Sequence, residues 1–142
     1  MKMSRTVAYA VQATLQLAQA PSNGPTPCRR LAIAGQMPER FLLQVLRNLV
    51  THGILQSTRG VEGGYRLERR PEEISLLEII EAVDGPLTPG IPASDGLPTE
   101  AQHRLHTALD RVTSTAREQL GAIKLSELMP PVEAPGREAS LV

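Results

Sequence analysis

The segment of residues 37–69 constrains the fold more than any other part of this chain. Pro38 and Gly53 are typical start and stop signals, and they predict a helix over residues 38–52. The residues at i, i+3, i+4 and i+7 of this helix are apolar and must face a core: Leu42, Val45, Leu46 and Leu49. Two short strand candidates, residues 54–58 and 64–67, flank a glycine-rich turn. A helix followed directly by such a hairpin predicts a winged helix-turn-helix.

The composition supports a small core made mostly of aliphatic side chains. Hydrophobic residues make up 41% of the 142-residue chain, but it has no Trp, one Phe and two Tyr. No run of about 18 apolar residues occurs, so we expect no membrane span. The N-terminus lacks the pattern of a signal peptide, and a single cysteine excludes an intrachain disulfide. These features predict a cytoplasmic protein.

Charge is divided unevenly along the chain, although the net charge is zero. Residues 1–70 carry ten Lys or Arg and three Glu, a net charge of +7, whereas residues 71–142 carry five basic and twelve acidic side chains, a net charge of −7. A basic half joined to an acidic half is typical of a nucleic-acid-binding head on a body that does not bind nucleic acid. On charge alone, chance clustering on solvated faces is the alternative.

Two helical patterns precede the central segment. Residues 4–20 predict a helix with Ser4 as its N-cap. Its expected apolar side consists of Val7, Val11, Leu15 and Ala18. A second short helix is expected over residues 28–34, with Thr26 as its N-cap and Gly35 as its stop.

Two further helices are predicted after the hairpin. Ser75 and Glu78 form a capping-box pattern that opens a fourth helix, and Thr99 and Gln102 form another that opens a long one. The long helix has apolar residues at near-heptad spacing: Leu105, Leu109, Val112, Ala116, Leu120 and Ile123. Such a stripe must fold back on its own domain or pair with a second copy. Because two-fold dimers are the commonest assemblies, we expect these six residues to form a homodimer interface.

The predicted fold class is therefore mainly α with a small β-wing. A winged helix-turn-helix domain is expected over residues 1–84 and a Pro/Gly-rich loop over residues 85–98. A dimerisation helix is expected over residues 99–129, and a disordered tail over residues 130–142.

Motifs from residue 37 to residue 128 follow the pattern of a known bacterial family. They read Met37-Pro38-Glu39-Arg40-Phe41-Leu42-Leu43-Gln44-Val45, Gly53-Ile54, Arg59-Gly60-Val61-Glu62-Gly63-Gly64-Tyr65, Ser75-Leu76-Leu77-Glu78-Ile79-Ile80 and Lys124-Leu125-Ser126-Glu127-Leu128. On these motifs, over roughly residues 1–129, the chain resembles the bacterial winged-helix transcription regulators that include IscR, NsrR and CymR (Rrf-type). The resemblance implies sequence-specific binding of a homodimer to a palindromic operator in double-stranded DNA.

The chemistry of the basic half agrees with DNA binding. Arg40, Gln44 and Arg47, on the outward side of the central helix, can form bidentate hydrogen bonds with base edges in a major groove. Arg59 at the wing tip can enter a minor groove. The whole predicted DNA-binding set is Ser4, Arg5, Arg29, Pro38, Glu39, Arg40, Gln44, Arg47, Arg59, Gly60, Gly63 and Gly64.

Some of these residues have other interpretations. A merely solvated helix face is the alternative for the polar residues of the central helix. Tyr65 is expected to pack the wing onto the core in preference to contacting DNA, and Phe41 is expected in the core.

The sensing residues depart from the family pattern. Cluster-binding members carry three cysteines in the region that corresponds to residues 86–104, and this chain has none there. Because thiolates hold iron–sulfur clusters, we expect no such cluster, no other cofactor and no metal. His103 and His106 lie one turn apart, but solvated helix residues are the favoured interpretation of both. Cys28 is favoured as a small buried residue over a redox switch.

We consider three functions for a chain with these residues. The favoured one is a dimeric DNA-binding transcriptional regulator, a repressor, that responds to an effector small molecule or a partner protein. The alternative is a protein-interaction module that keeps the winged-helix fold and acts through a partner protein; Gln44, Arg59 and the wing glycines argue against it. An enzyme is not expected, because no Ser-His-Asp set, metal-ligand cluster or phosphate-cradling loop occurs.

Overall fold

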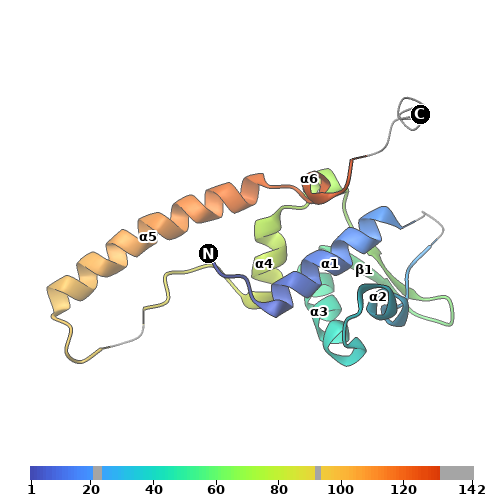
Figure 1. Ribbon diagram of the computed structural model, residues 1–142, viewed down its shortest axis with the longest axis horizontal. Coiled ribbons are helices and arrows are strands. Elements are labelled where there is room, and N and C mark those ends of the chain that lie inside the picture. Colours follow the sequence, from blue (N-terminus) through green and yellow to red (C-terminus); the bar gives the residue numbers. More distant parts are fainter. Residues whose placement is uncertain (21–23, 92–93, 132–142) are drawn as a thin grey trace, which may run out of the picture.

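A computed structural model describes residues 1–20, 24–91 and 94–131 (Figure 1). The elements in chain order are α1 (Arg5–Gln19), α2 (Cys28–Gly35), α3 (Glu39–Thr51), β1 (Leu55–Thr58), β2 (Gly64–Leu67), the 3-10 helix η1 (Pro71–Glu73), α4 (Leu76–Asp84), α5 (Thr99–Ala122) and α6 (Leu125–Leu128). Helices α1 to α4 and the hairpin form a head from which α5 projects (Figure 1). None of the described helices has the length and apolar character that a membrane span requires.

The head is held together by aliphatic side chains from α1, α3 and α4. The four predicted core residues of α3 are all buried, because they form one stripe along the helix. The predicted side of α1 needs correction. α1 buries Val7, Ala10, Ala13, Thr14 and Leu17, whereas Val11, Leu15 and Ala18 are half-buried. Small alanines let α1 lie close to its neighbours, and the Thr14 hydroxyl is satisfied by the carbonyl of Ala10 at 3.0 Å.

Helix α2 ends one residue later than predicted. Gly35 is its last residue, and Gln36 takes the left-handed cap conformation with φ 53°. The glycine serves packing here, since a Cβ atom at this position would lie 2.5 Å from the side-chain nitrogen of Gln12. That nitrogen donates a hydrogen bond of 2.7 Å to the Gly35 carbonyl, which joins α2 to α1.

The wing is a two-stranded antiparallel sheet in which Leu55 pairs with Leu67 and Thr58 with Gly64. Thr26 does not cap α2 as predicted; Pro27 holds the cap position without a side-chain bond. Thr26 instead exchanges two backbone hydrogen bonds with Tyr65, at 2.9 and 2.8 Å. The wing is therefore anchored to the segment that precedes α2.

The two predicted capping boxes had different outcomes. At α4 the Ser75 hydroxyl accepts from the Glu78 N–H at 3.1 Å, and Glu78 accepts from the Ser75 N–H at 2.9 Å. At α5, Pro98 holds the N-cap position and Thr99 is already helical, so the second box does not form. Pro98 has an extended conformation and no hydroxyl, which leaves this end of the helix without a side-chain cap.

The C-terminal part of α5 is joined to the head by backbone hydrogen bonds. The N–H of Leu76 donates to the carbonyl of Ile123, and the N–H of Leu125 donates to the carbonyl of Ile74, both at 2.8 Å. Leu125 is buried in the head. The predicted disordered tail falls, from residue 132 onward, outside the described residues.

Candidate nucleic-acid interface

The outward face of α3 carries a row of exposed polar side chains. Arg40, Gln44 and Arg47 are spaced at i, i+4 and i+7 and are all exposed, opposite the buried stripe. Glu39 lies in the first turn of the same helix, after Pro38 as the N-cap. Arg and Gln at this spacing can reach several base edges along one groove of a duplex.

A groove of about 690 Å³ lies between the C-terminal half of α3 and the wing. Arg47 lines it from the helix and Arg59 lines it from the wing. The hydroxyl residues around it are Thr51, Ser57, Thr58 and Tyr65. Two guanidinium groups and several hydroxyls in one groove are suited to the oxygen atoms of a phosphate backbone.

Two wing glycines are required by the backbone. Gly60 has φ +113°, a conformation that L side chains rarely adopt, so it allows the tight turn at the tip. Gly64 lies so close to the Thr26 carbonyl that an added Cβ would collide with it. A side chain at Gly64 would therefore push the wing away from α2.

Cys28 and Tyr65 line the same groove, and both are half-buried. Burial, with a smaller contribution from the Glu39 carboxylate, raises the pKa of the Cys28 thiol. Burial also raises the pKa of Tyr65; Cys28 adds to this shift and Arg47 opposes it. The Cys28 thiol is therefore held in its protonated, less reactive form. Tyr65 packs against the head core, as predicted.

Three other predicted DNA contacts do not line this groove: Ser4, Arg5 and Arg29. Ser4 caps α1, and its hydroxyl donates to the Asp84 carboxylate at 2.8 and 3.0 Å. Arg5, the next residue along the chain, is exposed. Arg29 lies beside an apolar patch on α2 that includes Ile33. These three residues stay predictions as phosphate contacts.

Phe41 is not in the core as predicted. Its side chain is 43% exposed, and the ring meets Tyr9 of α1 edge-on at 5.6 Å between centroids. Phe41 is the residue before the buried Leu42 on α3, so its side chain lies at the rim of the apolar stripe. The edge-on contact with Tyr9 covers part of the ring.

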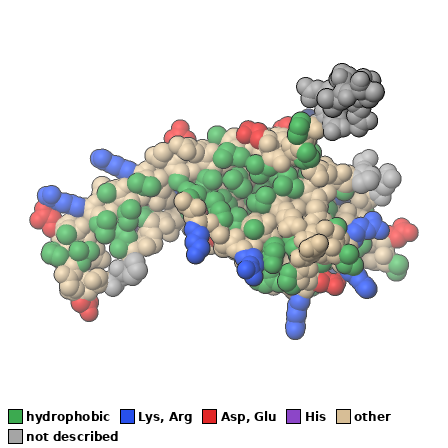
Figure 2. Space-filling model, viewed as in Figure 1, with side chains coloured by type: hydrophobic (Ala, Val, Ile, Leu, Met, Phe, Trp, Pro, Cys, Tyr) green, Lys and Arg blue, Asp and Glu red, His purple; other side chains and the backbone are tan. Residues whose placement is uncertain are grey.

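The apolar stripe of α5 is exposed toward its N-terminal end and covered toward its C-terminal end. Leu105 is 41% and Val112 64% exposed, whereas Leu120 is 7% exposed and packs against Val7 and Ile80 of the head. Leu109, Ala116 and Ile123 are half-buried. Figure 2 shows apolar side chains gathered over the centre of this face, where α5 meets the head. A groove of about 530 Å³ on this face is lined by Val112, Ala116, Leu120 and Ile123.

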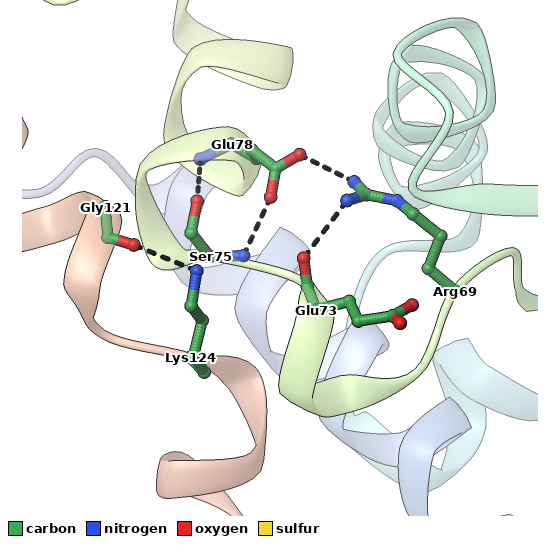
Figure 3. Close-up of polar contacts among 6 residues, drawn as sticks. All are labelled: Arg69, Glu73, Ser75, Glu78, Gly121 and Lys124. Carbon is green, nitrogen blue, oxygen red and sulfur yellow. Dashed lines mark hydrogen bonds and ion pairs between the residues drawn. The ribbon is translucent and has the colours of Figure 1, made fainter.

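Sequence reasoning missed a cluster of polar contacts at the root of the wing (Figure 3). Arg69 bonds to the Glu78 carboxylate at 2.6 Å and to the Glu73 carbonyl at 3.1 Å. Burial acts to raise the pKa of Glu78, but hydrogen bonds from Ser75 and Arg69 outweigh it, so the pKa is lowered. The capping box pointed to Glu78, whereas Arg69 had no local signal beyond its charge.

A second missed contact joins α4 to α5. Arg117 of α5 bonds to the Glu81 carboxylate of α4 at 2.5 Å, and the Leu87 N–H donates to the same carboxylate at 2.8 Å. Burial acts to raise the pKa of Glu81, but these two hydrogen bonds outweigh it and the pKa is lowered. The pair adds to the backbone bonds that hold the C-terminal part of α5.

Comparison with known proteins supports a regulator of transcription. The profile of the Rrf2 family, described as an iron-dependent transcriptional regulator, matches residues 3–131. The Mycobacterium tuberculosis protein Rv1287 is 44% identical over 87 residues, which cover 61% of the chain and 54% of Rv1287. The chain thus spans about half the length of this relative. IscR of Aliivibrio salmonicida is 31% identical over 130 residues, covering 91% of the chain and 77% of IscR.

Solved structures of two regulators have the same fold. CymR, described as the global cysteine regulator of Bacillus subtilis, superposes with a TM-score of 0.71 at 27% identity, covering 90% of the chain and 95% of CymR. T. potens IscR superposes with a TM-score of 0.66 at 29% identity, covering 90% of the chain and 85% of that structure. This likeness confirms the predicted winged-helix fold. The relatives are named as regulators of transcription and not as enzymes, as expected.

The donor set does not fit the iron that the family description mentions. Cys28 is the only cysteine, and its Sγ lies 3.8 Å from the Glu39 carbonyl on the head. Within residues 1–20, 24–91 and 94–131, no three His, Cys, Asp or Glu side chains come together as a metal site would require. His103 and His106 are both exposed on α5. No step of DNA binding is therefore assigned to iron.

Proposed function

Because the chain belongs to the Rrf2 family of transcriptional regulators, we propose that it binds double-stranded DNA in a sequence-specific way as a homodimer. Its target is a palindromic operator, it acts as a repressor, and it needs no iron–sulfur cluster. The observation that carries the proposal is the groove in which Arg47 of α3 and Arg59 of the wing face a common space.

The polar face of α3 reads the major groove in this proposal. Arg40, Gln44 and Arg47 are exposed on one side of a helix whose other side is buried. The wing follows α3 after a short turn, so that Arg59 and Gly60 lie beside the same stretch of duplex and the phosphate backbone runs through the groove between them. Pro38, Glu39, Gly63 and Gly64 support the two elements, and Ser4, Arg5 and Arg29 add outlying phosphate contacts.

A second copy of the chain covers the exposed part of α5. Leu105 and Val112 would otherwise remain in water, and both lie on one stripe with Leu109, Ala116 and Ile123. Two-fold pairing of α5 presents two α3 helices to the two halves of a palindrome. The working division of the chain is then a DNA-binding domain over residues 1–84, a loop over residues 85–98 and a dimerisation helix over residues 99–129.

A repressor that acts by occupying a promoter needs only to bind that promoter tightly. The head and the dimer helix together supply this binding. Release from the operator depends on an effector small molecule or a partner protein, since the thiol set of a cluster is missing. Bacterial DNA lies in the cytoplasm, and we place the protein there.

The proposal is tested by selecting bound sequences from random duplexes and then measuring affinity for the selected operator. Binding should weaken steeply with rising salt, because Lys and Arg release counterions from phosphates. Arg59→Ala and Gln44→Ala should each weaken operator binding, by roughly tenfold for a good base contact. Arg104→Ala is the matched control, since this exposed arginine on α5 pairs with Glu100 and lies outside the predicted DNA-binding set.

Weak binding at every salt concentration, with no selected sequence, would reject the regulator and favour a protein-interaction module. Equal affinities for the wild type and Arg59→Ala at moderate salt would remove the wing from the interface. Sedimentation of the wild type as a monomer at micromolar concentration would reject the homodimer.

A further inference from the structure

Arg69 makes two contacts at the root of the wing, although the sequence assigns it only a basic charge. It follows β2 by two residues, and its guanidinium lies between two acceptors in Figure 3. One nitrogen donates to the Glu73 carbonyl at 3.1 Å, at the end of η1, and the other donates to Glu78 at 2.6 Å. One side chain therefore joins the end of the wing to the first turn of α4.

Glu78 shares its carboxylate between two partners. One oxygen accepts from Arg69, and the other accepts from the Ser75 N–H at 2.9 Å to close the capping box. The residues on either side of Ser75 exchange backbone hydrogen bonds with Ile123 and Leu125, next to the end of α5. The same short segment thus carries the wing root, the start of α4 and the end of α5.

We propose that Arg69 is a positioning residue for DNA binding, which holds the wing at its working distance from α3 through its two bonds to Glu73 and Glu78 and does not itself contact DNA. The inference rests on the proposed DNA-binding function. It names a residue outside the predicted interface on which the placement of Arg59 depends.

The geometry of the guanidinium supports a positioning role. The two bonds use different nitrogens of one planar group, and the Arg69 side chain is only 33% exposed. A lysine has a single point charge and cannot hold both acceptors in the same directions. An arginine that served DNA only through its charge would be replaceable by lysine.

The wing has other anchors in the described part of the chain: Leu55 of β1 is buried in the head core, and the Glu68 N–H donates to the Ile54 carbonyl at 3.0 Å. The backbone bonds between Thr26 and Tyr65 hold the middle of β2 against the segment before α2. Arg69 ties the chain just after β2 to η1 and α4, so that losing it loosens this side of the wing root while the other contacts stay in place. A small tilt of the loosened wing would displace Arg59, at the far end of the hairpin, the most.

The test measures operator affinity for the full chain with Arg69→Ala, Arg69→Lys and Glu78→Gln, and with Arg70→Ala as the matched control. Arg70 is an exposed neighbour of equal charge whose side chain has no hydrogen bond or ion pair with the described residues. Arg69→Ala and Arg69→Lys should both weaken binding by roughly fivefold to tenfold. Arg70→Ala should lose less than about twofold, the effect of one distant charge.

Glu78→Gln separates positioning from simple electrostatics. Glutamine is a normal residue of a capping box, so α4 is expected to fold. Arg69 and Ser75 bond to different oxygens of Glu78, and in glutamine one of these positions becomes an NH2 group that cannot accept a hydrogen bond. Removing a negative charge from the head should strengthen DNA binding if charge alone matters. The positioning role predicts weaker binding instead, with an unchanged circular dichroism spectrum and a similar urea midpoint.

A double-mutant cycle with Arg59→Ala completes the test. If Arg69 acts through the placement of Arg59, then Arg69→Lys should cost less than about twofold once Arg59 is already alanine. Additive losses would mean that Arg69 contacts DNA directly and would overturn the inference. Full affinity of Arg69→Lys, or tighter binding of Glu78→Gln, would overturn it as well. A wild-type protein without salt-dependent operator binding would instead reject the proposed function itself.

Discussion

The head and helix α5 satisfy their apolar side chains in opposite ways. In the head, Leu42, Leu46 and Leu49 are fully buried by side chains of the same chain. On α5, Val112 is 64% exposed, and only Leu120, near the C-terminal end of the helix, is buried. Both helices have an apolar stripe in the sequence. Helix α3 lies among the other helices of the head, whereas α5 extends away from them (Figure 1).

An apolar stripe on a helix therefore does not by itself identify the surface that covers it. The stripe of α3 specifies the fold of the head, whereas the outer half of the α5 stripe remains available to a second molecule. Substitutions in the head should therefore act on folding at any protein concentration. Substitutions on the outer half of α5 should act on assembly and depend on concentration.

The largest effect is expected for Leu46→Ala in the head core. Leu46 is fully buried, so the substitution removes packing atoms and leaves a cavity. The free energy of unfolding should fall by about 2–5 kcal/mol, measured by urea denaturation. Leu128→Ala, at a position that is 39% exposed, is the matched control and should cost less than about 1 kcal/mol. Equal losses in the two variants would contradict the separation of core and surface.

A smaller effect, confined to assembly, is expected for Val112→Asp on α5. A carboxylate in the proposed dimer interface would lose its hydration, and the dimer dissociation constant should rise about 100-fold. Analytical ultracentrifugation measures this shift, and circular dichroism checks that the helices are retained. Ser114→Asp adds the same charge at an exposed position off the stripe and should leave the dimer intact. If both variants dimerise like the wild type, another surface forms the interface.

The smallest effect is expected where the two regions meet, at Glu81 and Arg117. The pKa of Glu81 is lowered in the folded protein, so its stabilising contribution is present above the unfolded value near 4.5. That contribution is lost as the pH falls through the lower folded pKa. Because the pair is partly open to solvent, with Arg117 42% and Glu81 22% exposed, Glu81→Gln should cost less than about 1 kcal/mol at pH 7.

The pH dependence supplies the control for this prediction. The difference in urea midpoint between the wild type and Glu81→Gln should shrink as the pH is lowered from 7 to about 3. A difference that stays constant over this range would show that the carboxylate charge does not stabilise the junction.

The elements that the sequence predicted well have signals within a few residues. Pro38, Gly53 and the stripe of α3 lie within one helix, and the Ser75–Glu78 box spans a single turn. The same type of pattern failed at Thr99, because the preceding proline took the cap position. Local patterns thus predict an element more securely than its boundary.

The contacts that position the candidate site were beyond prediction because they join distant residues. Tyr65 pairs with Thr26, and Gly35 fits against Gln12, through approaches that only the folded chain creates. The sequence around Arg69 does not indicate its two partners. An arginine in a basic segment has the same sequence context whether its side chain is hydrogen-bonded or solvated. The polar face of α3 was predictable, whereas the attachment of the wing was not.

The junction of α5 with the head has a mechanical consequence for a dimer. The helix has 24 residues and is about 36 Å long, and it is attached near its C-terminal end through Glu81 and the backbone of Ile123. A change of about 5° at this attachment would displace the far end by roughly 3 Å, close to the rise of one base pair. In the proposed dimer, the angle at which α5 leaves the head would therefore set the spacing between the two operator half-sites that it can bind.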